Sequence, residues 1–99
     1  MKNAISGNSI IVASKDQIFC DMEKEVVILN LKNGLYFTLD GAGNRIWNLI
    51  QEPKPVSEIQ DVVLAEYEIE PDQCKQDILA LLEELAAEGL IEVKDKAVV

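Results

Sequence analysis

The 99-residue chain contains no histidine, and its nine Lys and Arg residues stand against eighteen Asp and Glu residues. Without histidine the chain has no imidazole metal ligand and no Ser–His or Cys–His pair, and it lacks the commonest general base near neutral pH. The formal net charge of −9 repels phosphate backbones and anionic membrane surfaces, because nucleic-acid-binding proteins present clustered Lys and Arg. A cationic partner, or a neutral one bound through apolar and backbone groups, is therefore electrostatically favoured.

Cysteines and long apolar runs are also scarce. Cys20 and Cys74 are the only cysteines, and neither belongs to a C-x-x-C pair, so the sequence has no zinc or redox signature. We expect two free thiols in a cytoplasmic protein, with a single Cys20–Cys74 disulfide as the alternative. The N-terminus has no signal-peptide pattern, and every apolar run is far shorter than the ~20 residues of a membrane-spanning helix.

The hydrophobic share of 48 % is sufficient for a packed core, and the length corresponds to one small domain, residues 1–99. The first half of that domain has strand-like composition. Short apolar or β-branched runs predict strands at 17–22, 25–31 and 35–40, with 9–14 as a further candidate. Asn33 and Gly34 favour a type I′ hairpin turn before the last of these strands. In that strand one face takes Leu35, Phe37 and Leu39, and the other takes Tyr36, Thr38 and Asp40.

After Asp40 the apolar period changes from two residues to about 3.6, which predicts helices. The first expected helix follows Asp40 and ends at about 51. The second runs from 57 to about 67, and the third from 71 to about 88. Asp40 is a candidate N-cap for the first helix, and Ser57–Gln60 matches a capping box for the second. Pro71 suits the start of the third helix and Gly89 its left-handed C-cap, before a short extended piece at 90–93.

This order of elements predicts an α+β fold, winged-helix-like, in which a three-stranded antiparallel sheet is followed by three helices. The third helix carries an apolar arc that covers nearly half of its circumference. Either that helix is sandwiched between the sheet and the other helices, or part of the arc is left for a partner.

The familiar catalytic and cofactor motifs are missing. Gly41 and Gly43 open a helix after a strand, but Ile46 occupies the third glycine position of a dinucleotide fingerprint, so these glycines indicate a tight turn instead. The many carboxylates show no pairing in an apolar pocket that would separate their pKa values. We therefore expect no enzyme, no cofactor and no metal site.

A winged-helix DNA-binding regulator is the alternative that the fold class suggests. Its second or third helix would have to meet phosphates with basic side chains. The segment 57–67 has no Lys or Arg, and the third helix offers only Lys75 among several acidic residues. The chemistry thus argues against nucleic acid as a partner.

A peptide-binding surface fits the pattern better. The strand at 35–40 contains no Pro or Lys that would block pairing at an open edge. If the third helix lies beside that edge, a peptide could add as a further strand while helix side chains select its side chains. The alternative is that the N-terminal segment of the chain covers this edge.

The stretch GLYFTLDGAGNRIWNLI at 34–50 resembles the PqqD family, small domains also called precursor-peptide recognition elements. The resemblance continues through PVSEI at 55–59 and DILALLEELAAEGLI at 77–91, and covers about 9–93. It rests on three motifs in a fixed order: a G-x-Y-F-x-L strand, a G-x-x-I-W-x-L helix and an L-x-x-L-x-x-x-G-L-I helix end.

The resemblance implies a domain without catalytic chemistry that binds the leader of a ribosomally made precursor peptide as an added strand. The domain then delivers that precursor to a processing enzyme, such as a leader peptidase or a radical-SAM maturase. A free-standing copy is similar both to the lasso-peptide arrangement and to the protein of pyrroloquinoline-quinone synthesis, so the pathway stays open.

Carried onto this chain, the resemblance places the peptide between the strand and one flank of the third helix. The candidate peptide-binding residues are Leu35, Tyr36, Phe37, Thr38, Leu39, Asp40, Cys74, Asp77, Ile78, Leu81 and Glu84. Residues expected in the core instead are Trp47, Leu49, Ile50, Leu82, Leu85 and Ala86. Tyr36 faces either the trough or solvent, and Asp77 and Glu84 on the rim would suit a leader bearing Lys or Arg.

Overall fold

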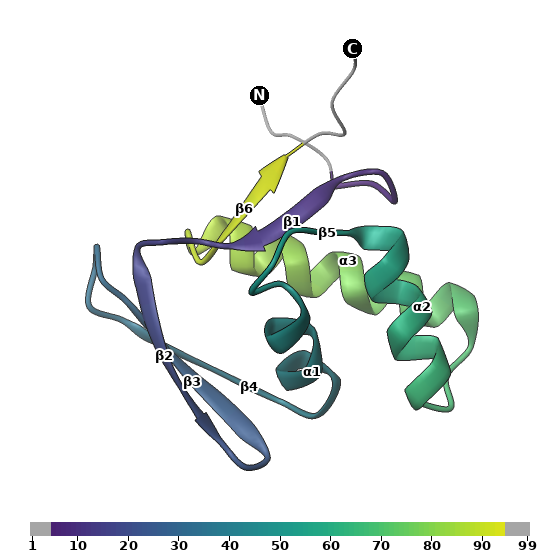
Figure 1. Ribbon diagram of the computed structural model, residues 1–99, viewed down its shortest axis with the longest axis horizontal. Coiled ribbons are helices and arrows are strands. Elements are labelled where there is room, and N and C mark those ends of the chain that lie inside the picture. Colours follow the sequence, from purple (N-terminus) through teal and green to yellow (C-terminus); the bar gives the residue numbers. More distant parts are fainter. Residues whose placement is uncertain (1–4, 95–99) are drawn as a thin grey trace.

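The β-branched runs between residues 10 and 40 form strands, and the segments with a 3.6-residue period after Asp40 form helices, in the computed structural model, which describes residues 5–94 (Figure 1). The elements are β1 (Ile10–Ala13), β2 (Gln17–Met22), β3 (Glu25–Asn30), β4 (Tyr36–Asp40), α1 (Gly41–Leu49), β5 (Lys54–Pro55), α2 (Val56–Glu66), α3 (Pro71–Ala87) and β6 (Ile91–Lys94). They confirm the expected α+β class with its three helices. None of the helices in the described range is long and apolar enough to cross a membrane.

The expected antiparallel meander is present as the sheet β2-β3-β4. Its register pairs Phe19 with Ile28 and Ile28 with Phe37. The type I′ turn predicted at Asn33-Gly34 is wrong, because only Gly34 has a positive φ, of 73°. A longer loop is held locally: the Gly34 N–H donates to the Asn30 carbonyl at 2.8 Å and the Leu35 N–H to the Asn33 side-chain oxygen at 2.9 Å.

A second three-stranded sheet, with order β5-β1-β6, joins segments that are far apart in sequence. Strand β1 pairs antiparallel with β6 from Ile10↔Lys94 to Ala13↔Ile91, and with the two-residue β5 on its other side. The candidate strand at 9–14 and the extended piece at 90–93 are both present. The sequence does not predict their pairing, because no local pattern records a partner some eighty residues away.

The helix ends differ in how far they follow local capping rules. Asp40 occupies the N-cap position of α1 in an extended conformation, but its side chain makes no capping hydrogen bond. The predicted Ser57 capping box is also wrong: α2 begins at Val56, whose N–H donates to the Ser9 carbonyl at 3.0 Å, and the Ser57 N–H donates to the Gly7 carbonyl at 3.2 Å. Backbone from the N-terminal segment thus replaces the side-chain cap.

The C-terminus of α3 ends as the sequence predicts. Gly89 has a φ of 74°, its N–H donates to the Ala86 carbonyl at 3.0 Å, and the Leu90 N–H donates to the Leu85 carbonyl at 3.0 Å. These two bonds are those of a Schellman motif, which satisfies carbonyls that the last helical turn leaves free. The chain then turns directly into β6.

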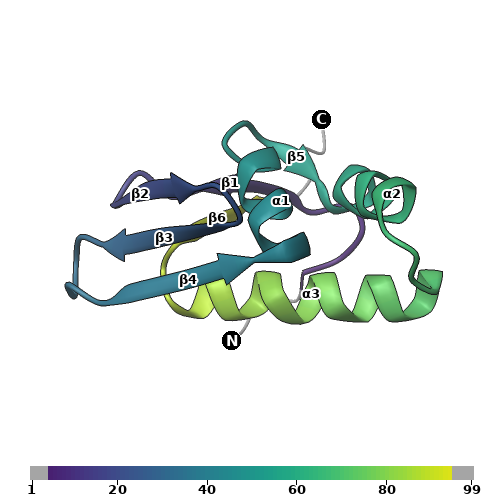
Figure 2. The ribbon, with the colours of Figure 1, turned by 90° about the horizontal axis from the view of Figure 1, so that it is seen from below.

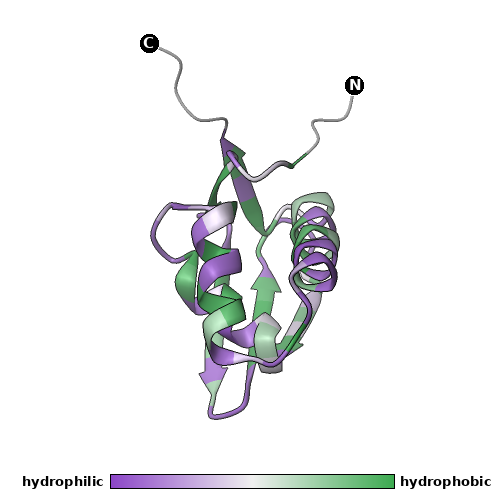
Figure 3. Cartoon of the chain, turned by 90° about the vertical axis from the view of Figure 1, so that its right-hand side faces the viewer, coloured by the Kyte–Doolittle hydropathy of each residue, from purple (hydrophilic) through white to green (hydrophobic). Residues whose placement is uncertain are grey.

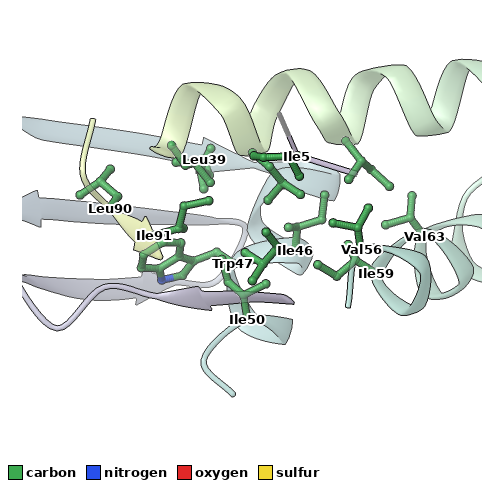
Figure 4. Packing of buried hydrophobic residues seen from close by; sticks show 14 of the residues in the cluster. Ile5, Leu39, Ile46, Trp47, Ile50, Val56, Ile59, Val63, Leu90 and Ile91 are labelled. Carbon is green, nitrogen blue, oxygen red and sulfur yellow. The ribbon is translucent and has the colours of Figure 1, made fainter. Parts of the chain in front are cut away.

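The core lies between the inner face of the meander, the second sheet and the three helices (Figure 4). Trp47 is fully buried, and its ring and that of Phe19 are nearly perpendicular, with centroids 5.7 Å apart. Ile50, Leu82 and Leu85 are also fully buried, as expected for core residues. The helices alternate hydrophobic and hydrophilic residues along their coils (Figure 3), so each presents one side to this core and another to solvent.

Candidate functional site

Strand β4 has an open edge. It is the last strand of its sheet and pairs only with β3 among residues 5–94. The N-terminal segment considered as a cover for this edge forms β1 of the other sheet instead. The backbone N–H and C=O groups on the outer side of β4 are therefore available to a further strand.

Side chains of β4 alternate between the core and solvent, as the period of two predicts. Leu39 is buried and Phe37 half-buried on the inner face, whereas Tyr36, Thr38 and Asp40 are exposed on the outer face. Tyr36 is 71 % exposed, so its side chain is accessible both to solvent and to a peptide added at this edge. Leu35 lies just before the strand and is exposed, so the strand is one residue shorter than expected.

Helix α3 lies on the β4 side of this sheet (Figure 2). Its buried residues pack into the core, while Leu81 is only half-buried and Asp77 is exposed. Both alternatives for its wide apolar arc therefore apply in part: most of the arc is core, and the flank at Leu81 stays accessible.

An apolar pocket of about 160 Å³ lies beside this flank. Its lining residues are Ala42, Gly43, Ile46, Val63, Ile69, Cys74, Asp77, Ile78 and Leu81. Four of the candidate binding residues from α3 are thus brought together. Cys74 and Ile78 are buried at its base rather than standing as an open wall, whereas Leu81 and Asp77 lie at its more exposed side.

Gly43 connects the pocket with the strand edge. A β-carbon at Gly43 would lie 3.4 Å from Leu39 Cδ2 and 3.7 Å from Leu81 Cδ2, so side chains of β4 and α3 converge over this one residue. The absence of a side chain keeps that space open. The turn interpretation of these glycines suits Gly41, with a φ of 55°, but it misses this role of Gly43.

Not all candidate residues gather in this place. Glu84 is exposed on α3 and does not line the pocket. No residue of β4 lines the pocket, but Leu39 approaches it at Gly43 of α1. The strand edge and the pocket are therefore neighbouring parts of one surface.

Asn30 is a residue of the site region that sequence reasoning did not single out. It is buried at the end of β3, where its Nδ2 donates to the Glu88 carbonyl at 2.6 Å and its Oδ1 accepts from the Lys32 N–H at 2.8 Å. One side chain thus ties the C-terminus of α3 to the hairpin that carries β4. Asparagine before a turn was a weak signal for this role, since the helix end lies 58 residues away.

Asp77 is the one charged residue among those that line the pocket. Gln73 Nε2 donates to the Asp77 carboxylate at 2.8 Å, and no ion pair within residues 5–94 involves Asp77. Burial raises the pKa of the Cys74 thiol, and the charge of Asp77 raises it further, so this thiol stays protonated near neutral pH. The pocket therefore combines an apolar base with one anionic rim residue.

The basic residue of α1, Arg45, is already engaged. Arg45 forms a two-pronged contact with Glu66, with Nε and Nη2 at 2.9 and 3.0 Å from the carboxylate oxygens. Its hydrogen bonds lower the pKa of the Glu66 carboxyl. The described part of the chain contains no cluster of three His, Cys, Asp or Glu residues placed to hold a metal ion.

The fold and this surface define a class of protein: a small winged-helix-like α+β domain with an open strand edge beside its longest helix. The family model for coenzyme PQQ synthesis protein D (PqqD) matches residues 25–91, and the chain belongs to the PqqD family. This match confirms the resemblance drawn from the three sequence motifs.

Two solved structures are similar to this chain. TbiB1 in complex with the TbiA(beta) leader peptide is 37 % identical, with a TM-score of 0.78, covering 82 % of this chain and 94 % of that chain. A lasso peptide synthetase B1 complexed with the leader peptide is 20 % identical, with a TM-score of 0.74, covering 83 % of this chain and 96 % of that chain, and supports the fold alone. No curated protein sequence matches the chain.

Proposed function

We propose that this protein binds the leader segment of a ribosomally synthesised precursor peptide by strand addition along β4. The observation that carries the proposal is the open, unblocked edge of β4 next to an apolar pocket on α3. Backbone pairing along the edge supplies affinity, and side chains that enter the pocket supply selectivity. The similarity to a TbiB1 chain solved with a leader peptide supports the same function.

The binding site combines two kinds of contact. Peptide backbone pairs with the residues 35–40, while the base formed by Cys74 and Ile78 accepts an apolar side chain beside Leu81. Asp77 and Glu84 on α3 are exposed and favour Lys or Arg in the leader, given the net charge of −9. We expect a dissociation constant between about micromolar and nanomolar, which corresponds to a binding free energy of about −8 to −12 kcal/mol.

The same proposal assigns no catalytic step to this chain. Bound leader is delivered in the cytoplasm to a processing enzyme, either a leader peptidase or a radical-SAM maturase. Holding the leader raises the local concentration of the attached core peptide at that enzyme, which accelerates processing without a reactive residue here. A duplex DNA ligand is disfavoured, because α2 has no Lys or Arg and α3 has only Lys75.

Titration of a fluorescently labelled leader tests the proposal. The first probe is the TbiA(beta) leader, which is bound in a similar structure, and the second is the leader of any short precursor found in the gene neighbourhood of this chain. Thr38→Pro should abolish binding, because proline removes an N–H from the strand and introduces a ring at the edge. Leu81→Arg should weaken binding at least tenfold, since it puts a charge beside an apolar pocket.

The matched control is Ala65→Arg, which adds the same charge at an exposed position of α2. It should bind the leader like the wild type. Circular dichroism of all three variants should match the unmodified chain. Unchanged affinity in both Thr38→Pro and Leu81→Arg, or no binding of either probe by the wild type, would contradict the proposed function.

A further inference from the structure

The outer face of the β2-β3-β4 sheet is unusually apolar for a solvent-facing surface. Strand register aligns Ile18, Leu29 and Tyr36 in one row across the sheet, and Cys20, Val27 and Thr38 in the next. Burial alternates along β3, with Val26 and Ile28 buried, so these rows lie on the side opposite the core. We call this set of six residues, together with Met22, the outer-face patch.

The patch is exposed where it is most apolar. Ile18 is 57 % exposed, Met22 52 % and Tyr36 71 %, whereas Val27 and Leu29 in the middle strand are half-buried. Helix α1 packs on the opposite side of this sheet (Figure 1). Contiguous apolar surface of this kind, spread over three strands, is typical of an interaction site rather than of scattered surface residues.

The patch is continuous with the edge to which the leader is proposed to bind. Tyr36 and Thr38 belong both to the patch and to β4. A strand added beside β4 extends the same sheet, and every second side chain of that strand points to the outer face. The bound leader would therefore widen the patch by one strand, so that protein and leader together form one surface.

Charge indicates whether a second copy of this chain or a different protein binds to such a surface. At one end of the patch, the row that contains Met22 continues with Glu25 and Asp40. Each copy of the chain also carries a net charge of −9, which opposes the close approach of a second copy. A different protein, with an apolar centre and Lys or Arg near the acidic end, is complementary to this surface.

We propose that the outer-face patch is the docking surface for the processing enzyme, and that bound leader forms part of that surface. The inference rests on the proposed leader binding and adds the place and the order of assembly. Because the enzyme contacts both components, leader and enzyme each strengthen the binding of the other by the same factor. We expect that factor to be at least about fivefold.

The test uses the full chain, the labelled leader that it binds, and a recombinant leader peptidase that cleaves the precursor carrying this leader. Ile18→Lys places a charge in the patch, on the strand of this sheet farthest from β4. It should leave the leader affinity of the isolated chain unchanged. It should lower enzyme binding and the rate of precursor processing at limiting protein concentration by at least tenfold, because the enzyme must then bury a charge.

The matched control is Ala65→Lys, an exposed position on α2 that receives the same charge. This variant should bind leader and enzyme like the wild type. A leader titration with and without the enzyme should show the expected rise in affinity in the wild type and its loss in Ile18→Lys.

Each outcome separates the two proposals. If the wild type does not bind leader, the proposed function fails. If leader binds but Ile18→Lys supports processing at the wild-type rate, the docking surface is wrong and leader binding stands. A concentration-dependent dimer in sedimentation equilibrium that Ile18→Lys dissociates would assign the patch to a second copy and overturn the inference.

Discussion

Single residues at the meeting point of β4 and α3 determine how much room a peptide side chain finds. Gly43 lies where Leu39 and Leu81 converge, and its missing β-carbon leaves the pocket open. The same residue lies within the first turn of α1, and glycine in a helix costs up to about 1 kcal/mol relative to alanine. Retaining glycine there makes the helix less stable and the pocket larger, so stability and binding oppose each other at this position.

Gly43→Ala should therefore stabilise the protein and weaken leader binding. The new methyl group would lie 3.4 Å from Leu39 Cδ2, an ordinary contact, so no backbone shift is required. We expect the free energy of unfolding to rise by up to about 1 kcal/mol, from helix propensity, in urea titrations. Leader affinity should fall about threefold or more, on the order of 0.7 kcal/mol, because the methyl occupies pocket volume.

Asn48→Ala is the control, at an exposed position of the same helix. Its leader affinity should equal that of the wild type. A Gly43→Ala variant that gains stability and keeps full leader affinity would show that the pocket is not used.

At the scale of elements, the relative position of the hairpin and α3 sets the groove, and Asn30 links the two. Its amide donates to the Glu88 carbonyl at the end of α3 and accepts from the Lys32 N–H in the hairpin loop. Both bonds are formed by a side chain that is only 6 % exposed. Loss of either partner leaves a polar group without a hydrogen bond, at a typical cost of about 1–3 kcal/mol.

Asn30→Asp should destabilise the protein more than Asn30→Ala does. The aspartate keeps the acceptor for Lys32 N–H but loses the donor, and it sets a negative charge against carbonyls at the negative end of the α3 dipole. We expect Asn30→Ala to lower the free energy of unfolding by about 1–3 kcal/mol in urea titrations. Hydrogen exchange of amides in the 31–35 loop should quicken in both variants.

Asn33→Ala, in the same loop, provides the comparison. It removes an exposed bond to the Leu35 N–H, and its effect should stay below that of Asn30→Ala. Equal stability of the wild type and both Asn30 variants would show that the link to Glu88 does not hold the helix end in place.

These elements also show which parts of the fold the sequence could predict. The meander and the C-cap at Gly89 depend on neighbours a few residues apart, so alternation and capping rules were sufficient. The β1–β6 pairing and the backbone caps of α2 by Gly7 and Ser9 depend on contacts between distant segments. The α3 residues that line the pocket were predicted by carrying the family resemblance onto one flank of that helix, whereas Gly43 and Asn30 act through partners on other elements.

At the scale of the whole molecule, a net charge of −9 surrounds a binding surface whose centre is apolar. The charge lowers the approach barrier for a cationic leader, and screening reduces this effect beyond about 10 Å at 0.1 M salt. The affinity for a leader bearing Lys or Arg should therefore fall severalfold between about 0.05 M and about 0.3 M NaCl, measured by fluorescence anisotropy. Affinity that does not depend on salt would contradict an electrostatic contribution.

Two neighbouring acidic residues on α3 allow the effect of a local charge on leader binding to be distinguished from the effect of the net charge. Glu83 and Glu84 are both exposed, but they differ by about 100° around the helix axis, and only Glu84 lies on the flank proposed to face the leader. Charge reversal at either position changes the net charge by the same amount. Glu84→Lys should weaken the binding of a cationic leader more than Glu83→Lys and should flatten the salt dependence. Equal losses in both variants would mean that the leader responds to the field of the whole molecule, and that Glu84 makes no direct contact.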